Sequence, residues 1–182
     1  VNTFVPVQPG TSLETIFTEG GTSPSLWKAA ELTLIERGVD PQHLTPGELI
    51  PIFDDEALTE HLEEIYHRAE SREAAASGTE VHIVRPHESM DHITEHFFKR
   101  SLYSTAEWVS LRDAVAEATG IPFGDKTMPG DVYTKPYTVH EYHVQADAVL
   151  QLDANTLAMM EQAIWRQRAG ERVYIPEALP IA

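Results

Sequence analysis

The stretch from His140 to Leu152, HEYHVQADAVLQL, carries the strongest structural pattern in the chain. Apolar side chains stand mainly at its even positions and polar ones mainly at its odd positions, with no Gly or Pro in between. Alternation with a period of two is typical of a strand with one buried and one solvated face. Because strands usually have about 5–6 residues, the pattern predicts one unusually long amphipathic strand over residues 137–152.

The sequence after this strand predicts a helix and a second strand. Asp153 or Asn155 can cap the helix and Gly170 can end it. Arg172–Ile175 is then typical of a short strand. Strand, helix and strand in this order can form a right-handed crossover between two parallel strands. The predicted sheet is therefore mixed.

Four more helices are expected upstream, because apolar residues recur there every three or four positions between capping residues and glycines. They are expected over residues 23–38, 54–78, 87–102 and 104–120. A short strand is expected at Glu80–Arg85, and residues 121–131 are expected to be a loop. The predicted fold class is α+β, with about five helices packed on a small mixed sheet.

The domain organisation predicted from these elements is simple. Residues 1–22 contain several turn-forming residues and few long apolar runs, so we expect an extended N-terminal arm. Residues 23–175 are expected to form a single α+β domain. Residues 176–182 are expected to be a C-terminal tail.

Composition excludes several classes of protein. The chain has 182 residues, a formal net charge of −16, nine His and no Cys. Without Cys there are no disulfides, thiolate zinc sites or iron–sulfur clusters. The acidic balance argues against a nucleic-acid partner, which would need a basic surface. No apolar run approaches the roughly 20 residues of a membrane helix, and no signal peptide is visible, so we expect no membrane association and a cytoplasmic or virion-associated protein.

One short motif points to chemistry. The segment His92-Ile93-Thr94-Glu95-His96 has the H-x-x-E-H spacing of an inverted zinc metallopeptidase motif, a resemblance that covers only these five residues. Histidines four apart on a helix can share one zinc ion, and Glu95 between them can activate a bound water. The third ligand is sought among Glu64, His67 and His143. The helical period places His92 and His96 opposite the apolar stripe, on the solvated face.

Acidic and polar side chains suggest a second kind of site, for a protein partner. The helix predicted from Asp54 carries a dense acidic run, which is either a solvated face or a docking surface for a basic protein. The predicted long strand also has a polar face. The candidate partner-binding residues are Glu60, Glu63, Glu64, Glu141 and His143.

Two functions remain open at this point. The first is a non-enzymatic acidic interaction or assembly protein, such as a virion component or an antitoxin-like inhibitor, which binds a second copy of itself or another protein. An arm, a long strand and a tail favour it, because such segments pair readily with other chains. The alternative is a small metal-dependent hydrolase built on His92, Glu95 and His96. Only this alternative requires a cofactor, which would be zinc.

Overall fold

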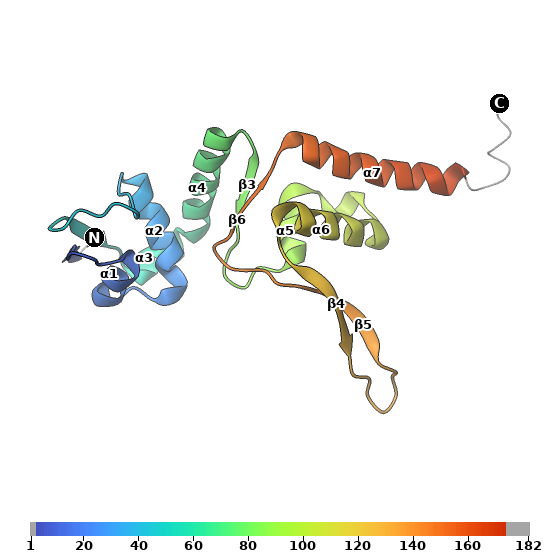
Figure 1. The fold of residues 1–182 in the computed structure, drawn as a ribbon, viewed down its shortest axis with the longest axis horizontal. Helices are drawn as coiled ribbons and strands as arrows, with labels where there is room; N and C mark the ends of the chain where they lie inside the picture. Colours follow the sequence, from blue (N-terminus) through green and yellow to red (C-terminus); the bar gives the residue numbers. More distant parts are fainter. Residues whose placement is uncertain (1–2, 174–182) are drawn as a thin grey trace. The chain divides into compact units, whose positions relative to one another are not determined.

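The computed structural model describes residues 3–173 and shows an α+β protein (Figure 1). Within this range there are seven α-helices and three separate two-stranded sheets, all antiparallel. The chain divides into two compact units, Val1–Ser77 and Gly78–Ala182, where the sequence suggested a single domain over 23–175. None of the helices in residues 3–173 combines the length and the apolar character needed to cross a bilayer.

The first unit is built around one pair of strands. Its elements are β1 (Thr3–Pro6), α1 (Leu13–Gly20), α2 (Trp27–Glu36), β2 (Leu49–Ile52), α3 (Asp55–Glu60) and α4 (Leu62–Ser77). β1 and β2 pair so that Val5 lies opposite Ile50. Ile16 of α1 and Leu34 of α2 are fully buried, as is Ile50. These side chains form the apolar core that holds the strand pair and the helices together.

The segment expected as an extended arm is part of this unit. It contains β1 and α1, an eight-residue helix where the sequence suggested at most one turn. The Ser12 side chain accepts a hydrogen bond from the Thr15 backbone N–H, and Gly21 ends the helix in the left-handed conformation. Leu13, Ile16 and Phe17 form the short buried face of this helix.

The second unit contains the remaining elements. They are β3 (Glu80–Ile83), α5 (Met90–Phe97), α6 (Thr105–Thr119), β4 (Phe123–Met128), β5 (Tyr137–Tyr142), β6 (Val149–Leu152) and α7 (Ala154–Val173). A short 3-10 turn, Arg100–Leu102, links α5 to α6. Ile93, Leu111, Val115 and Leu150 are buried in one apolar cluster. This cluster joins α5 and α6 to β6.

The prediction of one long strand over residues 137–152 was wrong. β5 ends at Tyr142, and a turn separates it from β6. Asp147 in this turn has a φ of 70°, a left-handed conformation that a strand does not contain. The two halves then pair with different strands, β5 with β4 and β6 with β3. The alternating pattern continues through both halves because one face of each strand is more apolar than the other. Alternation alone therefore could not reveal the break.

Four further expectations also need correction. The sheet is not mixed, since α7 continues through Val173, where a parallel strand at Arg172–Ile175 was expected; positions 174 and 175 and the predicted tail lie outside the described residues. Gly170 lies inside α7 and does not end it; a glycine inside a helix costs about 1 kcal/mol, which the rest of the helix can offset. Residues 123–128 form β4 rather than part of a loop. The helix count rises to seven partly because α1 was missed and the helix expected over 54–78 divides at His61 into α3 and α4.

Candidate functional site

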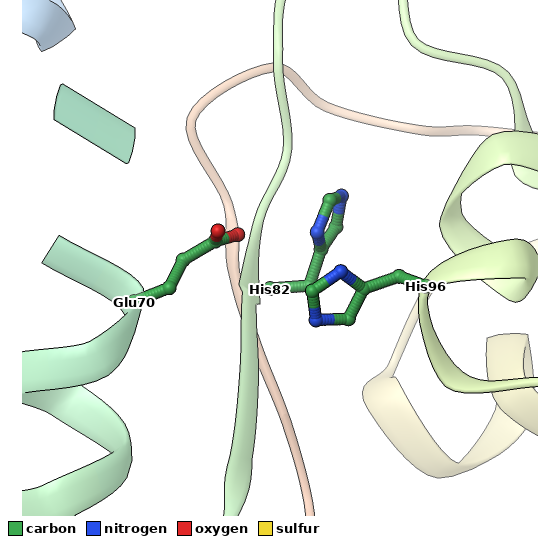
Figure 2. A group of neighbouring side chains, drawn as sticks. All are labelled: Glu70, His82 and His96. Atoms are coloured by element: carbon green, nitrogen blue, oxygen red, sulfur yellow. The ribbon is translucent and has the colours of Figure 1, made fainter. Parts of the chain in front are cut away.

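The second unit places two histidines against each other. His82 lies in β3 and is only 4% exposed, between the buried Val81 and Ile83. His96 lies in the last turn of α5 and is exposed. Their ring centroids are 4.3 Å apart with the planes tilted by 43°, and Figure 2 shows the two imidazoles facing each other. Glu70, the third residue in that view, belongs to α4 of the first unit, where its carboxylate lies 3.4 Å from His67 Nδ1.

Hydrogen bonds fix the buried histidine. The Nε2 atom of His82 lies 2.8 Å from Glu88 Oε1, and the same oxygen accepts a hydrogen bond from the Arg85 backbone N–H. The Arg85 guanidinium lies 3.4 Å from His82 Nδ1 and donates to the Ile83 carbonyl. Burial raises the pKa of the Glu88 carboxyl, but its hydrogen bonds with His82 and Arg85 outweigh burial, so the net pKa is lowered. An ionised Glu88 therefore orients the His82 ring.

The three polar residues of the H-x-x-E-H motif have different surroundings in the structure. The Nδ1 atom of His92 lies 3.0 Å from the hydroxyl of Ser89, the residue that caps α5. His92 and Glu95 are both exposed. The imidazole that lies against His96 is that of His82, which the sequence places in a strand but in no predicted site.

The proposed third ligands have other surroundings. Glu64 and His67 belong to the first unit, where Glu64 lies 2.7 Å from Arg68 and His67 lies 3.6 Å from Glu63. His143 follows β5 and lines a small hollow of about 200 Å³ with Thr119 and Leu150.

The acidic face proposed for a partner is partly neutralised within the first unit. Glu60, Glu63 and Glu64 are exposed on α3 and α4. Arg68 pairs with both Glu64 and Glu36, and Arg72 also pairs with Glu36. Glu141 on β5 is half-buried and lies 3.5 Å from Lys126 on the neighbouring strand. Such exposed pairs contribute little to stability, but they reduce the acidic character of these surfaces.

The β4–β5 hairpin is an exposed part of the second unit. The strands pair from Phe123 opposite Tyr142 to Met128 opposite Tyr137, and neither contains a fully buried residue. Figure 1 shows the hairpin reaching away from α5 and α6. At its tip, Val132 is 93% exposed and Tyr133 is 95% exposed.

The tip is ordered by its own hydrogen bonds. The Asp131 carboxylate accepts from the backbone N–H groups of Tyr133 and Thr134, at 2.7 and 2.8 Å, and from the Thr134 hydroxyl. These bonds, led by that of Tyr133, lower the pKa of Asp131. A side chain at Gly130 would place its Cβ 2.0 Å from the Thr134 carbonyl oxygen, so the turn requires glycine there. The loop thus presents Val132 and Tyr133 in a defined turn.

The base of the hairpin is attached to the helices. The Tyr142 hydroxyl donates a hydrogen bond to Asp113, and Arg112 Nε donates to the Tyr142 oxygen at 3.0 Å. Arg112 also pairs with Asp91, which in turn accepts from the Trp108 indole N–H. Burial and the bond to Asp113 raise the pKa of Tyr142 to about 12, although Arg112 opposes them. This network connects β5 to α5 and α6.

A groove lies beside the first half of α7. It has a volume of about 380 Å³ and an apolar lining that includes Phe97, Phe98, Leu102, Tyr103, Leu157 and Ala158. Leu102 is 62% exposed there. Arg168 holds α7 to α6 through two bonds to the Glu107 carboxylate, at 2.6 and 2.9 Å.

Sequence reasoning found neither the tip nor the groove as a site. Val132 and Tyr133 are two apolar residues in a Gly/Pro loop, which is a detectable signal. The groove gives no such signal, because its lining comes from three separate segments: β3, the end of α5 with the following 3-10 turn, and α7. Comparisons with family models, with curated proteins and with solved structures found no match to this chain.

Proposed function

We propose that this chain is a non-enzymatic assembly protein that associates with further copies of itself through the second unit. The observation that carries the proposal is the β4–β5 hairpin, whose tip exposes Val132 and Tyr133 almost completely. Exposed aromatic residues are enriched in protein–protein interfaces. A hairpin alone is marginally stable in water, so its attachment through Tyr142 and its ordered loop are consistent with a preformed contact element.

Self-association is tested by light scattering after size-exclusion chromatography, over a range of protein concentrations. We expect the wild-type mass to rise with concentration. The double variant Val132→Ser/Tyr133→Ser should stay monomeric at concentrations at least tenfold higher, because its tip no longer offers apolar surface. Met159→Ala is the control, since Met159 is an exposed apolar residue (61%) on α7 outside the groove. A wild-type chain that is monomeric throughout, or a tip variant that associates like wild type, would refute the proposal.

A second candidate function is metal binding, and the contact between His82 and His96 is the observation that favours it. Imidazole is a good zinc ligand, and a ligating histidine usually bonds a carboxylate through its other nitrogen, as His82 does with Glu88. In this arrangement zinc would bind Nδ1 of His82 in place of the Arg85 contact. A hydrolase built on the H-x-x-E-H motif would instead require His92 and Glu95.

Zinc titration by calorimetry separates the two metal hypotheses. If the ring pair binds zinc, His96→Ala should weaken binding at least tenfold, while His92→Ala on the same helix should leave it within about twofold. Comparable losses in both variants would favour the motif. No heat of zinc binding to the wild-type chain would remove both metal hypotheses, without affecting the assembly proposal.

A further inference from the structure

The hairpin tip and the groove beside α7 have matching chemistry. The tip offers two apolar side chains, Val132 and Tyr133, that are almost completely exposed. The groove is a hollow of about 380 Å³ with apolar and charged lining residues, and it is open to solvent at Leu102. Inserting a tyrosine into such a hollow removes apolar surface from water on both sides, which is the main driving force of association.

Both surfaces carry charged side chains of both signs. Asp131 and Lys135 stand on either side of the apolar pair of the tip, and Lys135 is exposed. The groove is bordered by the acidic Glu80 and Glu161 and by the basic Lys99. Lys135 can therefore meet an acidic rim while Asp131 meets Lys99. Complementary rim charges favour the correct orientation and faster association more than they add affinity.

From these observations we infer that the hairpin tip of one copy inserts Val132 and Tyr133 into the groove beside α7 of a second copy. The inference rests on the proposed self-association and names the surface that receives the tip. Both complementary surfaces belong to the same chain, so a second copy is sufficient as the partner. Because the two surfaces differ, the contact is head-to-tail, and repetition gives a ring or an open filament rather than a closed dimer.

A blocked groove provides the first test. Ala158 is exposed on α7 and lines the groove, so Ala158→Arg fills the hollow and places a positive charge where Lys135 would approach. Arginine is a good helix former, so α7 should remain folded, as checked by circular dichroism. Ala163→Arg is the matched control, because Ala163 is also exposed on the same helix but lies outside the groove. We expect Ala158→Arg to weaken self-association at least tenfold and Ala163→Arg to leave it within twofold.

Mixing two defective variants provides the decisive test. The tip variant Val132→Ser/Tyr133→Ser keeps an intact groove, and Ala158→Arg keeps an intact tip. Each should be monomeric alone, and an equimolar mixture should form a heterodimer that grows no further. If the tip variant is monomeric but Ala158→Arg associates like wild type, the tip binds another surface, and this inference fails while the assembly proposal stands. If the mixture stays monomeric, the inference also fails.

Discussion

The two ends of the β4–β5 hairpin contrast in how they are held. At the base, Tyr142 is hydrogen-bonded to Arg112 and Asp113 of α6, and Arg112 continues the network to Asp91 of α5. At the tip, the described hydrogen bonds of Asp131 run only to neighbouring loop residues. The fold therefore fixes where the hairpin starts and leaves its apolar end in solvent. Such a division is expected of an element that contacts another molecule.

The largest expected effect is on the base. Tyr142→Ala removes a half-buried ring and leaves Arg112 and Asp113 without their shared partner. We expect the second unit to lose about 2 kcal/mol of unfolding free energy, less than the cost of deleting a fully buried aromatic. Tyr133→Ala at the tip should change the unfolding free energy by less than about 0.5 kcal/mol. Urea unfolding of both variants measures the difference, and equal losses would erase the contrast between base and tip.

A smaller effect is expected at the attachment of α7. The bonds from Arg168 and the cap at Ser104 lower the pKa of Glu107 from 4.5 to about 2. A lowered carboxyl pKa stabilises the folded state fully above the unfolded value, and this contribution is lost as the pH falls from about 4.5 toward 2. Thermal melting between these pH values should show a decline that is shallower in Glu107→Gln. Parallel declines in the two proteins would show that this ion pair does not contribute.

The smallest effect concerns the order of the tip. Asp131→Ala removes the acceptor of three loop hydrogen bonds, but no core contact. Global stability should remain within about 0.5 kcal/mol of wild type. Amide hydrogen exchange at Tyr133 and Thr134 should become faster, as measured by NMR. Unchanged exchange would mean that the tip is ordered by something other than Asp131.

The sequence predicted local structure better than pairing. The helix expected over residues 104–120 matches α6. Its signals are local: caps at Ser104 and Gly120, and a buried stripe of Trp108, Leu111 and Val115. Strand partners depend on residues far apart in sequence, so alternation over 137–152 could not show that β5 pairs with β4 and β6 with β3.

The candidate site was likewise predictable only where its residues are close in sequence. The sequence identified His96 because His92 stands four residues before it. It missed His82, fourteen positions before His96, because nothing local indicates that β3 brings its ring to the end of α5. The exposed tip was predictable from Val132 and Tyr133 in a polar loop, but its receiving groove combines three separate segments.

Disulfide capture tests the central claim most directly, because the natural chain contains no Cys. One protein carries Lys135→Cys beside the tip and another carries Glu161→Cys at the border of the groove, so that Val132, Tyr133 and the apolar lining all stay intact. The two are mixed under mild oxidation. A disulfide needs Cα atoms about 4.4–6.8 Å apart, so it reports close contact. The account predicts that a disulfide-linked heterodimer dominates over either homodimer, and that Ala158→Arg in the groove protein abolishes it. Homodimers in statistical proportion, or a heterodimer that Ala158→Arg leaves unchanged, would contradict it.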